Sequence, residues 1–500
     1  MSAGESGVPR VFRGEADRGA QSPRYSPRLD AALSRLEALV DWERRARVAG
    51  AQRAMRVDCA PCSALLDVLG QPQRRFRAIH VTGSKGKGSV SAMVTYALST
   101  KAALKTGWYR SPHVERVTER VGIGQVPIED DVLAASLECA LDAKERAISQ
   151  DSASAAHHAT WFDVLCAAGM HALAAAEVDW AVVEVGMGGR RDSTNILHAP
   201  YAVLTNVFLE HAEIIGPTRT DIAYEKVGIV HRGTFLVTGV QQDDAEPEVF
   251  NTIKNYCAEI GAAGMCVVSE KEQRDAQQAR DVDGTPTKAH RSEPRANSML
   301  ERNRCMANAV LERMHADGIL AERIVVDAQD AHAAMRALPA RMESFFLPGS
   351  QVRVVIDGAH VPESVDHVIS ELMEQSIDPR HLVVLLAVGQ EKNAKGIVHA
   401  ATRHGCAALV CTQVGPEATY LPSHALYAQV KSTHDERGAV AEFQVADISN
   451  PLQALETALA MATALQSQTP EQMASACVLV VGSLHLAGKV RPMVRAAAGA

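Results

Sequence analysis

The stretch Ile79-His80-Val81-Thr82-Gly83-Ser84-Lys85-Gly86-Lys87-Gly88-Ser89-Val90 has the order strand, glycine-rich turn, helix. The mostly apolar run Ala78–Val81 predicts the strand, and Val90–Leu98 predicts the helix. Glycines allow successive backbone N–H groups to converge on phosphate oxygens, and the N-terminus of the following helix adds partial positive charge. The stretch therefore predicts a binding site for a nucleotide triphosphate at the end of a strand.

The glycine-rich turn departs from the common phosphate-loop pattern. In G-x-x-x-x-G-K-[ST] the lysine directly precedes the hydroxyl residue, whereas Gly88 separates Lys87 from Ser89 here. Lys87 can still reach the β- and γ-phosphates, and Ser89 can bind Mg²⁺. The alternative is a surface turn that merely contains glycine and lysine, which the flanking strand and helix disfavour. The residues expected to contact the nucleotide triphosphate in this loop are Gly83, Ser84, Lys85, Gly86, Lys87, Gly88 and Ser89.

Strand and helix signals alternate on both sides of this loop. Apolar residues recur with helical spacing over 29–40, which predicts an amphipathic helix. Helical stretches such as Val132–Ile148 and Trp161–Ala176 then separate short β-branched runs, a rhythm typical of parallel α/β sheets. The further runs expected to form strands are Ala181–Val185, Ala202–Val207, Val352–Ile356, His381–Leu386, Ala408–Cys411 and Cys477–Val481.

Two interruptions of this rhythm indicate the organisation of the chain. Between residues 270 and 297 the only aliphatic side chain larger than alanine is Val282, so we expect a polar insertion or a mobile loop there. Proline and glycine punctuate residues 338–349, just before a new strand and helix series. We therefore expect an ATP-binding P-loop domain at 29–342 and a smaller, Rossmann-like α/β domain at 343–500.

Residues 1–28 combine five arginines with Ser, Gly, Pro and three acidic residues. They are expected to be either a disordered extension or a targeting segment, and the acidic residues favour the extension. We accordingly expect a cytoplasmic protein, with a mitochondrion or a plastid as the alternative if the segment is a transit peptide.

The composition of the 500-residue chain excludes several classes of protein. Hydrophobic residues (47%) and charged residues (22%) are near globular averages, which excludes a disordered, collagen-like or coiled-coil protein. The net charge of −8 gives no basic excess, so neither nucleic acid nor a membrane surface is an expected partner. No apolar run approaches the roughly 18 residues that span a bilayer. Ten scattered cysteines are expected to be reduced thiols.

Further motifs follow the phosphate loop in a fixed order. They are Tyr109-Arg110-Ser111-Pro112-His113 with Glu119-Arg120, Thr160-Trp161-Phe162-Asp163, the glycine-rich run from Glu184 to Asn195, Leu209-Glu210-His211, Glu225-Lys226-Val227-Gly228-Ile229, Asp357-Gly358-Ala359-His360, and the run from Gly482 to Gly488. Together with Thr-Gly-x-x-Gly-Lys-Gly-Ser at 82–89, this series resembles the folylpolyglutamate synthase and dihydrofolate synthase family, relatives of the Mur peptide ligases. The resemblance extends over about residues 30–490.

The resemblance implies a ligase of the Mur type that consumes ATP. A carboxylate is a poor electrophile, so such an enzyme transfers the γ-phosphoryl group of ATP to it, with charge neutralised by Mg²⁺ and lysine. The amine of L-glutamate then meets the resulting acyl phosphate. The implied acceptor is a pteroate or folate carboxylate, which places the reaction in folate biosynthesis and one-carbon metabolism. The implied partners are these small molecules alone, and the implied assembly is a monomer.

The resemblance also implies roles for single residues. Ser89, Glu184 and His211 correspond to Mg²⁺ ligands, and apolar strands precede all three, which would bring them to one edge of a sheet. Lys226 corresponds to a lysine that is typically carbamylated and bridges to a second Mg²⁺, the alternative being a helix-surface lysine. Lys87, Lys226, Asp357 and His360 correspond to catalytic residues. Asn308, Arg341 and Asp357 correspond to nucleotide contacts, and Ser111, Pro112, His113, Arg120 and Asp192 to substrate contacts.

Several positions depart from the family pattern. Glu210 replaces an aspartate, Ala340 replaces a glycine, and Val361 stands where Asn or Thr is most common. The segment before Asn308 also lacks the usual Gly-x-His-Gln. These departures leave open a nucleotide-binding pseudoenzyme, against which the retained charged residues argue.

The motifs constrain the acceptor substrate less than they constrain the reaction. Residues 189–195 and Glu210-His211 resemble dihydrofolate synthases and bifunctional bacterial enzymes more than the eukaryotic enzymes that only extend glutamate chains. We therefore expect dihydrofolate synthase activity, either alone or with folylpolyglutamate synthase activity. Folylpolyglutamate synthase activity alone is the alternative, and the Ser111-Pro112-His113 block argues against a peptidoglycan ligase.

Overall fold

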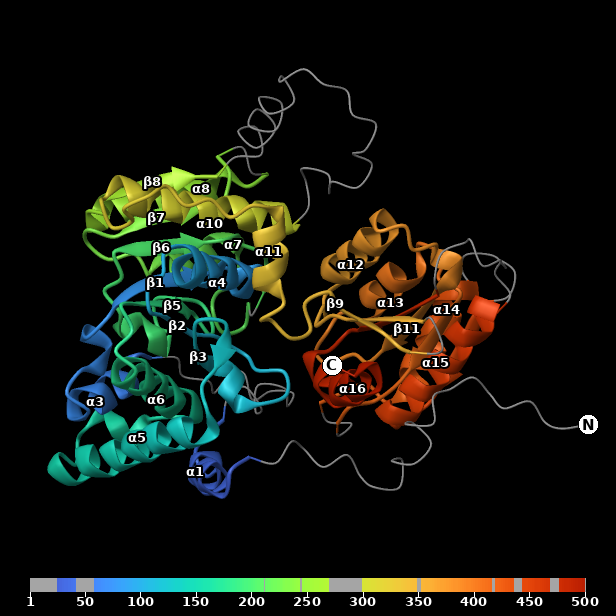
Figure 1. The fold of residues 1–500 in the computed structure, drawn as a ribbon, viewed down its shortest axis with the longest axis horizontal. Coiled ribbons are helices and arrows are strands. Elements are labelled where there is room, and N and C mark those ends of the chain that lie inside the picture. Colours follow the sequence, from blue (N-terminus) through green and yellow to red (C-terminus); the bar gives the residue numbers. More distant parts are fainter. Residues whose placement is uncertain are drawn as a thin grey trace, which may run out of the picture. The chain divides into compact units, whose positions relative to one another are not determined.

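The structure is a computed structural model that describes residues 25–41, 58–210, 212–242, 245–268, 299–348, 352–415, 419–435, 443–467 and 476–499. These residues form two compact units, shown in Figure 1. The N-terminal unit runs from Tyr25 to Leu338, and the C-terminal unit begins at Pro339. The polar insertion expected at 270–297 and residues 1–24 of the expected extension lie outside the described residues.

The N-terminal unit is built on an eight-stranded sheet of order β4-β3-β2-β5-β1-β6-β7-β8. The strands from β2 to β8 in this order are parallel, whereas β3 and β4 pair antiparallel at one edge. The strand that leads into the glycine-rich turn, β1, therefore lies inside the sheet. The strands are β1 (Arg77–Thr82), β2 (Thr106–Tyr109), β3 (Val121–Ile123), β4 (Val126–Pro127), β5 (Trp180–Glu184), β6 (Tyr201–Leu204), β7 (Phe235–Thr238) and β8 (Gly264–Val267).

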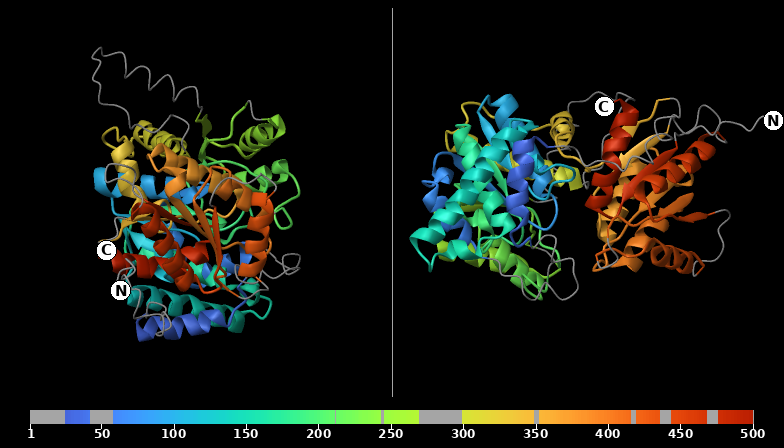
Figure 2. Two further views of the ribbon diagram at one scale, coloured as in Figure 1. Left: turned by 90° about the vertical axis from the view of Figure 1, so that its right-hand side faces the viewer. Right: turned by 90° about the horizontal axis from the view of Figure 1, so that it is seen from below.

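Helices cover both faces of this sheet. Figure 2 shows helices of this unit from two further sides. Alternate residues of β1 belong to different cores: Ala78 packs with α1, α3, α5 and α6, whereas Ile79 and Val81 pack with α4, α10 and α11. The residues of β6 and β7 on the first face pack with α7 and α8. The helices are α1 (Pro27–Glu37), α3 (Ala60–Val68), α4 (Lys87–Tyr96), α5 (Asp130–Gln150), α6 (Trp161–Ala175), α7 (Arg219–Val227), α8 (Pro247–Ile260), α10 (Met299–Ala316) and α11 (Ala328–Met335).

The C-terminal unit contains a six-stranded sheet of order β13-β12-β11-β14-β10-β9. All neighbouring strands are parallel except β9, which pairs antiparallel with β10. The strands are β9 (Glu343–Phe346), β10 (Arg353–Ile356), β11 (Leu382–Leu386), β12 (Ala408–Cys411), β13 (Gln444–Asp447) and β14 (Cys477–Val481). The helices are α12 (Pro362–Glu374), α13 (Ala394–Thr402), α14 (Ser423–Asp435), α15 (Pro451–Ser467) and α16 (Leu484–Ala498).

Short helical turns connect several of these elements. They are η3 (Pro72–Arg74), η4 (Ala97–Lys101), η5 (Val117–Arg120), η6 (Ala155–His158), η7 (Ser193–Ile196) and η8 (Pro379–His381).

The expected α/β class, with two sheets dominated by parallel strands, is confirmed. The expected strands coincide with β1, β5, β10, β11, β12 and β14 to within a residue at each end, whereas the run at 202–207 ends as a strand at Leu204. Strand β2 was not expected, because its sequence Thr-Gly-Trp-Tyr contains a glycine. A Cβ atom at Gly107 would lie 2.4 Å from Leu173 Cδ2, so the close packing of α6 on β2 requires a glycine there.

Two features bear on the location of the protein. In the part of the chain that the structure describes, no helix is both long and apolar enough to cross a membrane. The ten cysteines all lie in that part, and each is a free thiol.

The departure at Val361 leads to a first prediction. Val361 is the N-cap of α12 and has extended backbone geometry, but its side chain cannot accept a hydrogen bond from the first turn. Because asparagine at an N-cap satisfies one of the free N–H groups, Val361→Asn should raise the free energy of unfolding of the C-terminal unit by about 1 kcal/mol. Urea unfolding, with hydrogen exchange at α12 amides to locate the gain, measures this change. Val361→Ala is the control, because it removes the valine without adding an acceptor. A Val361→Asn protein no more stable than Val361→Ala would contradict the prediction.

Candidate functional site

The glycine-rich turn follows directly after β1 and ends where α4 begins at Lys87. Gly83 has φ +142° and Gly86, the N-cap of α4, has φ +87°. Residues other than glycine rarely adopt these backbone conformations. A Cβ atom would lie 1.8 Å from Thr205 Oγ1 at Gly83 and 2.4 Å from Asn303 Oδ1 at Gly86. Both glycines are therefore required by conformation and by space.

The loop after β6 holds this turn in place. Asn206 Oδ1 accepts a hydrogen bond from Lys85 N (2.8 Å), and Asn206 Nδ2 donates to Lys85 O (2.9 Å). Thr205 Oγ1 donates to the same carbonyl (2.6 Å), and Ser84 N donates to Asn206 O (3.1 Å). The shape of the turn is thus fixed by its neighbour in the sheet.

The charged and hydroxyl side chains of the turn lie at the start of α4. Lys87 Nζ donates to Gly83 O across the turn (2.9 Å). Ser89 is 8% exposed, within the first turn of α4. Ser84 Oγ accepts from Phe208 N (3.0 Å) and is also nearly buried. The arrangement of backbone N–H groups, a lysine and a helix N-terminus is the one expected for a triphosphate site.

Glu184 is the last residue of β5, and it pairs in register with Val81 of β1. Its side chain is 5% exposed, and a Cβ atom at Gly88 would lie 3.7 Å from Glu184 Oε2. The carboxylate therefore lies beside the first turn of α4, which also carries Ser89. Oxygen donors of this kind suit Mg²⁺. The third expected metal ligand, His211, lies outside the described residues.

Lys226 is buried on α7, with 2% of its side chain exposed. Its Nζ lies 3.1 Å from Glu210 Oε1. Burial lowers the pKa of Lys226 to about 8; the positive charges of Lys87 and Lys85 also lower it, whereas Glu210 raises it. Lys226 is therefore near the lysines of the glycine-rich turn, and a sizeable fraction of its amine is neutral at slightly alkaline pH.

The second glycine-rich segment, 186–195, follows β5 and leads through η7 toward β6. Thr82 Oγ1 donates to Gly188 O (2.7 Å), and a Cβ atom at Gly189 would lie 2.7 Å from Lys226 O. Asp192 is 3% exposed and accepts from Met187 N (2.9 Å) and Thr194 N (3.0 Å). The carboxylate of Asp192 thus organises the segment, which packs closely on the helix that bears Lys226.

The block after β2 is held by two internal contacts. Arg120 is 1% exposed, and its Nε donates to His113 Nδ1 (2.9 Å), so the proton of a neutral His113 lies on Nε2. Glu119 accepts hydrogen bonds from the backbone N–H groups of residues 114–116. Ser111 is half-buried and Pro112 exposed, and the peptide bond between them is cis. The two residues are accordingly accessible at the end of the strand.

Asp357, Arg341 and His360 gather at the end of β10 in the C-terminal unit. Asp357 accepts from Met342 N and Ala359 N (2.8 Å each), and burial raises its pKa while Arg341 lowers it. His360 Nδ1 lies 2.8 Å from Gly358 O and therefore donates to it. Ala340 has φ +52°, a conformation that glycine adopts more readily than alanine, so this departure from the pattern that the sequence resembles places alanine in a strained backbone conformation.

The sequence did not single out Asn303, which faces the glycine-rich turn from α10. Asn303 is 4% exposed and lies on the buried side of α10 with Met306 and Ala307. Its polar side chain lies within an otherwise apolar helical stripe, which could have indicated that it contacts a polar neighbour such as the turn. Asn308, which was expected to contact the nucleotide, uses its amide on Val326, donating to the carbonyl (3.0 Å) and accepting from N–H (2.8 Å).

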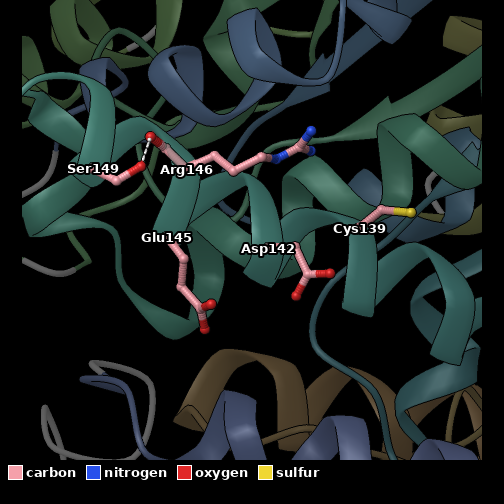
Figure 3. Close-up of a pocket in the computed structure, with 5 residues that line it drawn as sticks. All are labelled: Cys139, Asp142, Glu145, Arg146 and Ser149. Atoms are coloured by element: carbon pink, nitrogen blue, oxygen red, sulfur yellow. Dashed lines mark hydrogen bonds between the residues drawn. The ribbon is translucent and has the colours of Figure 1, made fainter.

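A surface hollow along α5 contains none of these residues. It is lined by Cys139, Asp142, Glu145, Arg146 and Ser149, drawn in Figure 3. Arg35 pairs with Asp142 and Glu145, and Ser149 Oγ donates to Arg146 O. The hollow therefore belongs to the polar surface of one helix and is separate from the site at the ends of the strands.

Comparison with known proteins gives two family models and several relatives that match this chain. Residues 81–292 match the family model described as "Mur ligase middle domain", and residues 340–484 match "Mur ligase, glutamate ligase domain". The chain is 31% identical over 371 residues to a dihydrofolate synthase/folylpolyglutamate synthase of Mycobacterium tuberculosis, covering 68% of this chain and 70% of that protein. It is 28% identical over 339 residues to a protein of the same name from Bacillus subtilis, and the match covers 67% of this chain and 76% of that protein.

A solved structure resembles the fold over nearly the whole chain. The structure of Mycobacterium tuberculosis folylpolyglutamate synthase complexed with ADP has a TM-score of 0.69 and 26% sequence identity. The match covers 93% of this chain and 99% of that chain.

The close approach at Gly83 gives a prediction. Gly83→Ala would force the new Cβ atom against Thr205 and displace the turn, and displacements of about 1 Å can cost about 100-fold in activity. We expect the affinity for an ATP analogue, measured by calorimetry, to fall by at least about tenfold. Gly233→Ala is the matched control, because Gly233 also has positive φ but nothing within 4 Å. Equal nucleotide affinity in the two variants would show that the turn does not hold the nucleotide.

Buried His80 gives a third prediction. Burial lowers the pKa of His80 to about 3, and His80 Nε2 lies 2.9 Å from Thr194 Oγ1. Below about pH 6.5 the unfolded chain binds a proton that the folded chain does not accept until about pH 3. The free energy of unfolding therefore decreases as the pH is lowered through this window. The loss should approach about 1.4 kcal/mol per pH unit.

Urea unfolding between pH 7 and pH 4 compares the wild type with His80→Gln. Other acid groups titrate in both proteins, so the difference between them isolates His80. The advantage of the wild type should shrink as the pH falls, and a difference that does not change with pH would contradict a neutral His80.

Proposed function

Because this chain belongs to the folylpolyglutamate synthase and dihydrofolate synthase family of Mur-type ligases, we propose that it joins L-glutamate to a pteroate-type carboxylate in an ATP-dependent reaction. The proposed reaction passes through an acyl phosphate. We propose dihydropteroate as an acceptor, with addition of further glutamates to folate as a second activity of the same site.

The observation that supports this proposal best is the gathering of Lys87, Ser89, Glu184 and Lys226 around one turn. Glu184 lies beside the first turn of α4, which carries Ser89, and the charges of Lys87 and Lys85 act on Lys226. Phosphoryl transfer to a carboxylate requires charge neutralisation and positioning rather than covalent help. Lys85 and Lys87, with a carboxylate suited to Mg²⁺ beside the turn, would meet that requirement.

We propose that Lys87 neutralises the β- and γ-phosphates and that the N–H groups of residues 83–89 bind their oxygens. Ser89, Glu184 and His211 would hold Mg²⁺, which supplies positive charge to the transferred phosphoryl group. Asn308, Arg341 and Asp357 would contact the nucleotide, and His360 the acyl phosphate. Ser111, Pro112, His113 and Arg120 would contact the acceptor, whereas Asp192 would act through the shape of its loop.

Burial gives Lys226 a property that carbamylation requires. Carbon dioxide reacts with a neutral amine, and the pKa of about 8 leaves part of Lys226 neutral near pH 7.5. We propose that Lys226 is carbamylated in the active enzyme and that the carbamate binds a second Mg²⁺. Bicarbonate should then raise the activity of enzyme purified without it.

We further propose that small molecules are the only partners that this activity needs, and that the active chain is a cytoplasmic monomer. The ten free thiols support a reducing compartment. Sedimentation of the active enzyme tests the state of assembly.

The reaction is tested with purified protein, ATP, Mg²⁺ and labelled glutamate, with dihydropteroate and tetrahydrofolate offered in separate tubes. ADP release and product mass are followed. Product with both acceptors is expected for a bifunctional enzyme, and product with dihydropteroate alone for a dihydrofolate synthase. Product with tetrahydrofolate alone would overturn the proposed acceptor, and no product in either tube would overturn the ligase activity.

Removing the positive charge of Lys87 should stop turnover. Lys87→Ala is expected to lower kcat by at least about 100-fold, because a group that stabilises transition-state charge contributes that much or more. Its circular dichroism and unfolding midpoint should remain near those of the wild type. Lys105→Ala, at the exposed start of the same sheet, is the control and should turn over normally. Near-normal turnover of Lys87→Ala would contradict the role of the turn.

Glu184→Gln tests the metal ligand at nearly constant shape. The amide is a weaker ligand than the carboxylate, so the Mg²⁺ concentration for half-maximal activity should rise by about tenfold or more. An unchanged Mg²⁺ dependence would contradict the ligand role of Glu184.

A further inference from the structure

Arg110 is a buried cation that the reaction described above does not use. It is 5% exposed, and its Nε, Nη1 and Nη2 atoms are each buried without a hydrogen-bond partner in the described part of the chain. A guanidinium group carries a full charge and five N–H donors. Burying such a group unsatisfied costs free energy, so its retention in this place points to a bound partner.

The guanidinium group of Arg110 is held on a rigid platform. Its carbon lies 4.1 Å from the ring centroid of Trp108, and Trp108 Nε1 donates to Gly124 O (3.1 Å). A Cβ atom at Gly122 would lie 2.1 Å from the Trp108 ring, so the ring fits only against a glycine. Arg110 N also donates to Arg120 O (2.8 Å), which fixes the backbone. The donors are thus preorganised.

No carboxylate of the described chain accepts a hydrogen bond from the Arg110 side chain. Burial lowers its pKa to about 10, which leaves it charged at neutral pH. Glu184 attracts it, but does not accept a hydrogen bond from it. When Glu184 binds a cation, that attraction is no longer available to Arg110. An anionic ligand is then the natural partner.

The strand order indicates which ligand this is. Tyr109 of β2 pairs with Val183 of β5, and Glu184 of β5 pairs with Val81 of β1. Arg110, Glu184 and the glycine-rich turn therefore follow three adjacent parallel strands at the same edge of the sheet, about 4.8 Å apart. Arg110 lies on the side of Glu184 away from the triphosphate turn, next to Ser111 and Pro112. This is where the group that receives the phosphoryl should be.

We propose that Arg110 binds the carboxylate of the acceptor substrate, the carboxylate that ATP activates. The inference rests on the proposed function, which supplies the acceptor. A carboxylate accepts two parallel hydrogen bonds from a guanidinium group, and no neutral side chain offers the same fork. L-glutamate and ATP are also anionic, but the turn after β1 already holds the phosphates. Arg110 would therefore distinguish the acceptor from the other two substrates.

This role has a consequence that a purely structural arginine would not have. Without a ligand the buried charge is unpaired, so its replacement by an apolar side chain of similar length should not destabilise the free protein. With acceptor present, the same replacement should remove a charged hydrogen-bonding partner. Arg110→Met should therefore have an unfolding midpoint at least equal to that of the wild type and a lower acceptor affinity.

The test uses direct binding, so it does not depend on turnover. The dissociation constants of dihydropteroate, tetrahydrofolate, L-glutamate and a non-hydrolysable ATP analogue are measured with Mg²⁺ in wild type, Arg110→Met and Arg110→Lys. Arg77→Met is the matched control, because Arg77 also lies over a tryptophan, Trp180 at 5.7 Å, but is exposed at the opposite end of β1. Unfolding midpoints are measured for all four proteins.

We expect Arg110→Met to weaken acceptor binding by about 10- to 100-fold while affinity for the ATP analogue stays within about twofold of the wild type. Arg110→Lys should lose less acceptor affinity, because lysine keeps the positive charge but not the two parallel N–H donors of the guanidinium group. Acceptor affinity in Arg110→Met equal to that in Arg77→Met would overturn the inference and leave the proposed function intact, as would a loss confined to ATP or L-glutamate. A wild-type protein that binds neither acceptor would overturn the proposed function and the inference together.

Discussion

The site depends on one constraint, the close contact between the glycine-rich turn and the loop after β6. Asn206 and Thr205 bind both polar backbone groups of Lys85, and the turn approaches Thr205 so closely that Gly83 cannot carry a side chain. These contacts exist because β1 and β6 are parallel neighbours that end at the same edge. The backbone N–H groups of the turn are therefore oriented before any ligand arrives, and phosphate binding needs little rearrangement.

Around this turn the N-terminal unit concentrates positive charge that its own carboxylates only partly balance. Lys226 is buried with a lowered pKa, and Arg110 is buried without a hydrogen-bond partner in the described residues. Both arrangements reduce the stability of the free protein. An anionic substrate would supply the hydrogen-bond acceptors that Arg110 lacks in the free protein. A group that lowers the stability of the free protein can in this way raise its affinity for a ligand. Such a trade-off between stability and function is common at active sites.

The sequence was sufficient for the class of the fold and for the position of the triphosphate turn, because apolar runs, glycines and the helix start are local signals. It was insufficient where packing decides. Strand β2 contains Gly107. A glycine is needed there because Leu173, which lies on a helix some sixty residues later in the chain, packs against it. Asn303 is the one polar residue among the buried residues of α10, but only the structure shows that it faces the turn. The lack of a hydrogen-bond partner at Arg110 is a property of three adjacent strands and their side chains, which no single stretch of sequence reveals.

The order of the strands also has an evolutionary consequence. The block proposed to bind the acceptor, the carboxylate proposed to bind Mg²⁺ and the glycine-rich turn follow β2, β5 and β1, so each belongs to a separate loop on a shared sheet. Mutations in the loop after β2 can alter which carboxylic acid is accepted without disturbing the backbone of the turn, which is secured by β6 on its other side. Such a division allows descendants to diversify their substrates while the chemistry of activation is inherited unchanged.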